Sequence, residues 1–108
     1  MQSVLSDYTL AQIRASKQFR NLEKVGLRLV STNRQLENGT LSFEGSVKVG
    51  KSVLNPSYQV TAVGMVISNK HSARFVNADS NIGMYRKGLD AVTELLTKQI
   101  VKQIQTAA

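Results

Sequence analysis

Apolar and polar positions alternate through the middle of the chain, whereas longer apolar spacings precede and follow that region. Within 41–49, polar residues separate most of the apolar ones, which are Leu41, Phe43, Val47 and Val49. This period is typical of a strand with one buried face. Asn38-Gly39 stands just before the run and favours a type I′ hairpin turn. The pattern therefore predicts a first strand from Leu27 toward Leu36, a tight turn and a second strand.

Two further strands are expected downstream. Gly50-Lys51 interrupts the alternation and indicates a bulge or a bend, and Asn55-Pro56-Ser57 predicts a turn. The run from Tyr58 to Ile67 is apolar on both faces, as in a central strand or in one that a partner covers. A corner at 68–70 precedes a last strand over 72–76. The four strands, within 26–77, are expected to form an antiparallel meander.

Residues 4–24 show the spacing of an amphipathic helix. Apolar side chains recur there at steps of three and four on one face, namely Tyr8, Ala11, Ala15, Phe19 and Leu22. Ser6 or Asp7 can cap the start of this helix, and Gly26 its end. Leu10 and Ile13 fall toward the opposite, basic side, which carries Arg14, Lys17, Arg20 and Lys24. A second subunit packing on that side would explain them.

A second helix is predicted over 81–105, with Asp79 or Ser80 as its cap. At 1.5 Å per residue it would be ~36 Å long, which is more than a small sheet requires. We therefore expect the helix to bend near Thr97 or to reach onto another chain. The predicted fold class is α+β: an N-terminal helix, a four-stranded antiparallel meander and a long C-terminal helix. Residues 1–108 are expected to form one domain.

Charge narrows the choice of partner. Fourteen Lys and Arg against seven Asp and Glu give a net charge of +7, with a pI near 10.1. This balance favours an anionic partner such as nucleic acid or a membrane surface, although charge also keeps small domains soluble. The absence of cysteine excludes disulfides and thiolate chemistry. No membrane span and no signal peptide are visible, but a fragment cut from an exported precursor would look the same.

No catalytic or metal-binding constellation is apparent, so we expect no enzyme, cofactor, metal or small-molecule substrate. His71 is the single histidine and lies at a predicted strand corner, where a surface role is more common than that of a base. The acidic residues show no metal-ligand spacing. Asp90 and Glu94 lie four residues apart on the last helix, as in ordinary helix-surface pairing. No phosphate-binding glycine loop is present.

The polar face of the predicted sheet is the candidate binding surface. Hydroxyls, amides and cations stand two residues apart on neighbouring strands, and such groups donate to phosphate oxygens. Glu44 opposes an anionic ligand, and no aromatic side chain is expected there to stack on a base. A half-solvated sheet without function shows the same alternation. This face is expected to carry Arg28, Thr32, Ser42, Glu44, Ser46, Lys48, Gln59, Thr61, Ser72 and Arg74, with Lys51 and Ser57 at its rim.

From Ser46 to Leu96, the order of features resembles the coat proteins of single-stranded RNA bacteriophages, the leviviruses. The matching segments are SVKVGK at 46–51, NPSYQVT at 55–61, SARFV at 72–76 and the helix over 84–96. The resemblance implies an intertwined homodimer with one continuous sheet, in which each chain's helices lie over the partner. It also implies a shell built from dimers, a virion protein assembled in the bacterial cytoplasm, and single-stranded RNA bound on the inner sheet face. By position, the implied RNA contacts are Ser46, Lys48, Gln59, Thr61 and Arg74, with Lys51 and Ser57 near them.

Two other families share parts of the pattern. The order of helix, antiparallel strands and closing helix is similar to that of small periplasmic lipoprotein domains of the YajG type. In such a non-enzymatic envelope protein, the basic face would meet lipid headgroups or an assembly partner. The double-stranded-RNA-binding domain shares the α-β-β-β-α order, but only Arg86 and Lys87 stand where its lysine cluster would lie. We expect a viral coat protein that packages RNA, with the envelope domain as the alternative.

Overall fold

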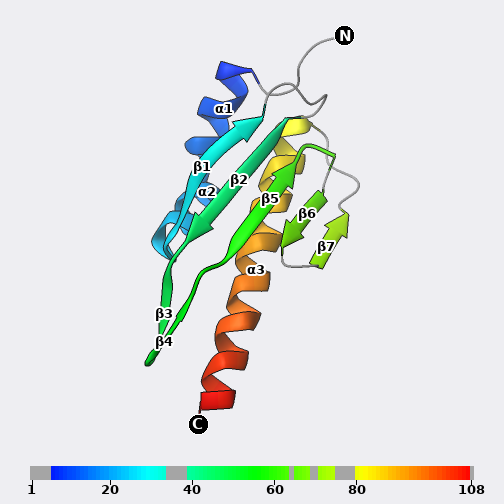
Figure 1. Ribbon diagram of the computed structural model, residues 1–108. Helices are drawn as coiled ribbons and strands as arrows, with labels where there is room; N and C mark the ends of the chain where they lie inside the picture. Colours follow the sequence, from blue (N-terminus) through cyan, green and yellow to red (C-terminus); the bar gives the residue numbers. More distant parts are fainter. Residues whose placement is uncertain (1–5, 34–38, 64, 69–70, 75–79, 108) are drawn as a thin grey trace.

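A layer of helices covers one face of an antiparallel sheet (Figure 1). The computed structural model describes residues 6–33, 39–63, 65–68, 71–74 and 80–107. The helices are α1 (Asp7–Arg14), α2 (Lys17–Lys24) and α3 (Asn81–Ala107). The strands are β1 (Leu27–Asn33), β2 (Thr40–Gly45), β3 (Val47–Val49), β4 (Ser52–Leu54), β5 (Ser57–Thr61), β6 (Met65–Ser68) and β7 (His71–Arg74). The α+β class and the long C-terminal helix are as predicted.

Five of the strands form the main sheet, in the order β1-β2-β5-β6-β7. The remaining two, β3 and β4, pair only with each other and form a ribbon that we call the arm. The arm continues the β2–β5 hairpin away from the sheet (Figure 1). Where the two parts meet, the amide of Gly45 donates a hydrogen bond of 3.2 Å to the carbonyl oxygen of Pro56.

The prediction of four strands is wrong, because the chain departs from it in two segments. Residues 58–67 are not one strand, because β5 ends at Thr61 and β6 runs back beside it from Met65. The chain also reverses at Gly50, with φ of 62°, and not at Asn55-Pro56. A left-handed conformation of this kind is easiest for glycine. Asn55-Pro56 merely separates β4 from β5, and Pro56 is buried.

The N-terminal helix predicted over 4–24 is two helices, because Ser16 ends one and begins the next. Its hydroxyl donates to the carbonyl of Ile13 at 2.6 Å and accepts from the amide of Phe19 at 3.2 Å. The change of axis rotates α1, so that Ile13 is fully buried while Tyr8 is 72% exposed. The predicted apolar face is therefore wrong for the first half of the segment, where Tyr8, Ala11 and Ala15 are exposed. The burial of Ile13 requires no second subunit.

The predicted helix caps are confirmed where the structure describes them. The hydroxyl of Ser6 accepts from the amide of Thr9, and that of Ser80 from the amide of Gly83, each at 3.1 Å. Gly26 follows α2 with φ of 101°. The alternative cap Asp79 and the turn residue Asn38 lie outside the described residues.

Helix α3 packs closely on the centre of the sheet. A Cβ atom at Gly88 would overlap the side chain of Val60, so glycine permits this approach. Tyr85 is fully buried, and its hydroxyl donates a 3.0 Å hydrogen bond to the carbonyl of Gly39 at the start of β2. Burial raises the pKa of Tyr85 to about 12. These contacts leave the opposite face of the sheet free of described elements (Figure 1).

Candidate nucleic-acid interface

The side of the five-stranded sheet that points away from the helices is the candidate interface, and we call it the outer face. One row of residues crosses all five strands, as the strand pairing shows: Ser31, Ser42, Gln59, Ile67 and Ser72. With about 4.8 Å between strands, this row spans about 19 Å. It offers hydroxyl and amide groups, interrupted by Ile67, which is 43% exposed.

Three of the seven predicted RNA contacts are exposed on the outer face itself. Ser57 and Gln59 lie on the central strand β5, and Arg74 lies on the edge strand β7. Arg74 stands opposite Met65 of β6. Two strand spacings, about 10 Å, therefore separate the Arg74 backbone from β5.

Thr61 is also on this side of the sheet, but its hydroxyl is not available to a ligand. The Oγ1 atom is buried and has no hydrogen-bond partner among the residues that the structure describes. A backbone position on the outer face is therefore not sufficient for contact with RNA.

The other three predicted contacts belong to the arm or its base. Ser46, Lys48 and Lys51 are all exposed, and Lys51 lies in the turn at the tip. Lys48 pairs with Val53, six residues before Gln59, which corresponds to about 20 Å along the strand. The seven candidates thus do not form one compact site. They follow the β2–β5 hairpin from the arm to the sheet, with Arg74 at the side.

A hollow of about 450 Å³ lies where the arm leaves the sheet on the β1 side. Its lining includes Arg28, Glu44 and Ser46. Arg28 and Glu44 stand opposite each other in the β1–β2 register. The carboxylate of Glu44 weakens this hollow as an anion site, because it opposes the charge of Arg28.

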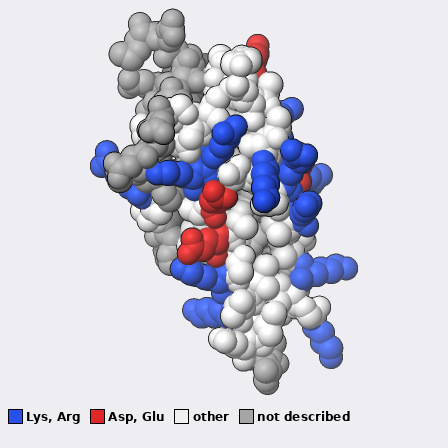
Figure 2. All heavy atoms as spheres, turned by 180° about the vertical axis from the view of Figure 1, so that it is seen from behind, with Lys and Arg blue, Asp and Glu red and all other residues white. Residues whose placement is uncertain are grey.

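Basic charge is not confined to the outer face. Figure 2 shows the helix side, where lysine and arginine side chains surround a smaller acidic group. The helices carry eight basic residues: Arg14, Lys17, Arg20, Lys24, Arg86, Lys87, Lys98 and Lys102. They also carry four acidic residues, Asp7, Glu23, Asp90 and Glu94. Among the described residues of the strands and turns, the charged side chains are Arg28, Lys48, Lys51 and Arg74 against Glu44 alone.

The described residues contain no group of three or more His, Cys, Asp or Glu side chains that could hold a metal ion. Within the same part of the chain, no helix is both long and apolar enough to cross a membrane. Comparison of the chain with family models, curated proteins and solved structures gave no match. The function is therefore argued from the surfaces described above.

Proposed function

We propose that this protein binds single-stranded RNA on its outer face and self-associates, as a coat protein of the levivirus type does. The observation that carries the proposal is the outer face, which no described element covers and which presents Ser57, Gln59 and Arg74 beside an arm with two further lysines. Hydroxyl and amide groups position phosphates by hydrogen bonds, and the cations release counterions on binding.

The chemistry of this face favours binding that depends little on RNA sequence. Base recognition in single-stranded RNA commonly uses aromatic stacking, and the described part of the outer face carries no aromatic side chain. The described cations of the outer face and the arm are Arg28, Arg74, Lys48 and Lys51. If all of them contact phosphate, log K falls with log salt concentration with a slope of about −2.8, at about −0.7 per contact.

Self-association is proposed to use an open edge of the sheet. In the described part of the chain, β1 and β7 each have a strand neighbour on one side only. Unpaired backbone groups on an edge strand are a template for a second chain. Pairing of two copies would give a homodimer with one continuous sheet and two adjoining outer faces, from which a shell could be built.

The test combines a charge variant of the outer face with a matched variant of the helix layer. Lys48→Ala/Arg74→Ala and Lys17→Ala/Arg86→Ala each remove one lysine and one arginine that are exposed. Size-exclusion chromatography with absorbance at 260 and 280 nm measures particle size and RNA content together. We expect the first variant to elute like the parent with at most about half its RNA, and its salt slope to fall by about 1.4. The helix-layer variant should keep both values.

Three outcomes would contradict the proposal at different points. Unchanged RNA content in Lys48→Ala/Arg74→Ala would remove the outer face as the binding site. Equal losses of RNA in the two variants would show that the interaction depends on net charge and not on the outer face. A parent protein that elutes as a small species free of nucleic acid would remove the coat function.

The envelope-domain alternative has one observation in its favour, the eight basic residues of the helix layer. Such a layer could lie against anionic headgroups, at about 1 kcal/mol for each basic side chain near the surface. Flotation with vesicles that contain phosphatidylserine separates the two functions. Membrane binding that Lys17→Ala/Arg86→Ala weakens, in a protein free of RNA, would favour the envelope domain.

A further inference from the structure

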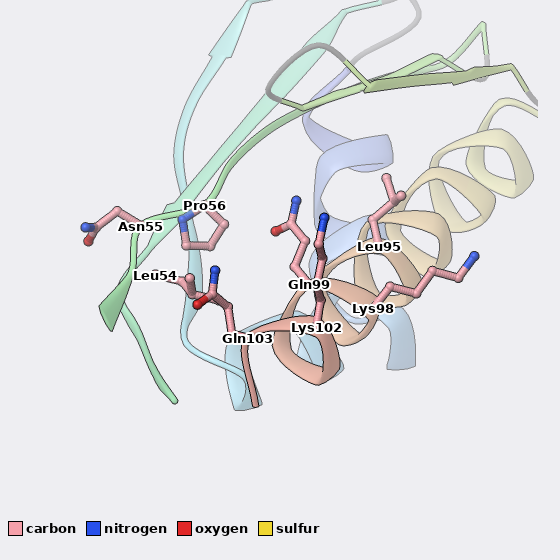
Figure 3. A pocket seen from close by; sticks show the side chains of 8 residues that line it. All are labelled: Leu54, Asn55, Pro56, Leu95, Lys98, Gln99, Lys102 and Gln103. Carbon is pink, nitrogen blue, oxygen red and sulfur yellow. The ribbon is translucent and has the colours of Figure 1, made fainter. Parts of the chain in front are cut away.

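A groove of about 490 Å³ lies between α3 and the break that separates β4 from β5 (Figure 3). Its volume is in the range of about 300–1,000 Å³ that is typical of small-molecule sites. The residues that line it are Leu54, Asn55, Pro56, Leu95, Lys98, Gln99, Lys102 and Gln103. It is separate from the outer face, because α3 lies on the other side of the sheet.

Both sides of the groove contribute apolar side chains, beside the five polar residues of its lining. Leu54 and Pro56 come from the strand break, and Leu95 comes from the helix. Leu95, Gln99 and Lys102 follow at steps of four and three, so they share one flank of α3. This flank therefore brings an apolar side chain, an amide and a cation to the same opening.

The amide of Gln99 has a defined orientation. Its Oε1 atom accepts a 3.2 Å hydrogen bond from the hydroxyl of Tyr58, a fully buried residue of the sheet. Because the carbonyl end of the amide is held by Tyr58, the NH₂ end is the part of Gln99 that can donate to a ligand.

The two lysines of the groove differ. Lys102 extends in the same direction as Gln99, toward the sheet, whereas Lys98 points away from it (Figure 3). Lys98 also pairs with Glu94 at 3.4 Å on the exposed side of the helix. No Asp or Glu is among the described residues that line the groove, so its charge is complementary to an anion.

We propose that this groove binds an amphiphilic carboxylate, a medium-chain fatty acid or a compound of that class. The carboxylate accepts from the Lys102 ammonium and from the Gln99 amide, and the alkyl chain lies between Leu54, Pro56 and Leu95. A neutral amphiphile would place only an uncharged acceptor against Lys102, and a cationic one would be repelled by it, so both should bind less well.

Calorimetric titration of the full chain with decanoate, below the concentration at which it forms micelles, tests the site. Decanol and decyltrimethylammonium are the control ligands. We expect one decanoate per chain, and about fourfold weaker binding for each methylene removed in octanoate and hexanoate. No binding by decanoate, or equal binding by decanol, would overturn the proposal.

Three variants locate the binding. Lys102→Gln should weaken decanoate binding about tenfold or more, because it removes a charge-assisted hydrogen bond. Gln99→Glu keeps an acceptor for Tyr58 but repels a carboxylate, so it should weaken binding at least as much. Lys98→Gln makes the same charge change at a lining residue whose side chain points away from the sheet, and it should alter affinity less than about threefold. Equal effects of Lys98→Gln and Lys102→Gln would reassign the interaction to overall charge.

The site is independent of the proposed RNA interface. Lys48→Ala/Arg74→Ala should bind decanoate as the parent does, because neither residue lines the groove. Loss of decanoate binding in that variant, with its thermal unfolding unchanged, would show that the groove alone does not form the site.

Discussion

The two ends of this elongated molecule, which measures 52 × 22 × 22 Å, are buried to very different degrees. One end, the body, consists of the five-stranded sheet, α1, α2 and residues 81–94 of α3. The other, the lobe, consists of the arm and residues 95–107. Tyr58, Tyr85 and Leu89 of the body have no exposed surface. In the lobe, Leu96 is only 1% exposed, but Val53, Val101 and Ile104 are 50%, 47% and 55% exposed.

The difference follows from what each part packs against. In the body, helices cover one side of the central strands, so the apolar side chains on that side are removed from water. The lobe has one helix against two strands of three residues each, and a two-stranded ribbon alone is marginally stable. Only the inner side of the arm is covered, where Val47 and Val49 are 9% and 8% exposed. The body thus contains most of the buried core, and the lobe leaves more of its apolar surface in contact with water.

The largest expected effect on stability comes from shortening a buried side chain of the body, and the same change in the lobe is the comparison. Leu89→Ala removes a fully buried side chain from the body and should lower the free energy of unfolding by about 2–5 kcal/mol. Ile104→Ala, in the lobe, should lower it by less than about 0.5 kcal/mol, because the side chain is already half in water. Urea unfolding followed by circular dichroism measures both. Similar losses would show that the lobe is buried in solution, for example against a second copy.

The sequence was sufficient to predict much of the body. Alternation placed Tyr58, Val60, Ala62 and Val66 on one face, and all four are buried. It did not show that the chain reverses between them. After the reversal, Val60 and Val66 stand opposite each other on neighbouring strands. Both therefore point to the same face, and the alternation of buried positions looks the same as in a single strand.

The candidate sites were harder to predict, for two physical reasons. Alternation tells which side of a strand a residue is on, and Ser57, Gln59 and Arg74 are exposed as expected. Alternation does not show that β3 and β4 leave the sheet, which places Lys48 far from Gln59. It also does not show that the hydroxyl of Thr61 is buried. The groove could not be found from sequence, because Tyr58 and Gln99 are 41 positions apart and only the packing of α3 brings them together.

A smaller loss of stability is expected from a substitution at Gly45, where the body joins the lobe. A Cβ atom at residue 45 would overlap the backbone carbonyl of Gly26. Since backbone cannot move as a side-chain end can, Gly45→Ala should cost about 1–3 kcal/mol of stability. Gly50→Asn at the arm tip should cost less than about 0.5 kcal/mol, because there is open space around Gly50 and asparagine tolerates its φ of 62°. Thermal unfolding of both variants checks this, and a larger loss from Gly50→Asn would mean that the lobe limits stability.

A still smaller loss than that of Gly45→Ala is expected at Tyr85, which links α3 to the residue before β2. Tyr85→Phe removes its hydrogen bond to Gly39 and should cost about 1 kcal/mol at neutral pH. Burial raises the pKa of Tyr85 to about 12, whereas in the unfolded chain a tyrosine has a pKa of about 10. Between these pH values the unfolded chain releases the proton more readily, so the parent loses stability as pH rises from about 10 to about 12. Tyr85→Phe has no such proton and should show a shallower decline in urea unfolding over that range. If stability declined equally with pH in the parent and in Tyr85→Phe, the body would open at this hydrogen bond before the phenol ionises. The side chain of Tyr85 would then be less completely buried than that of Leu89.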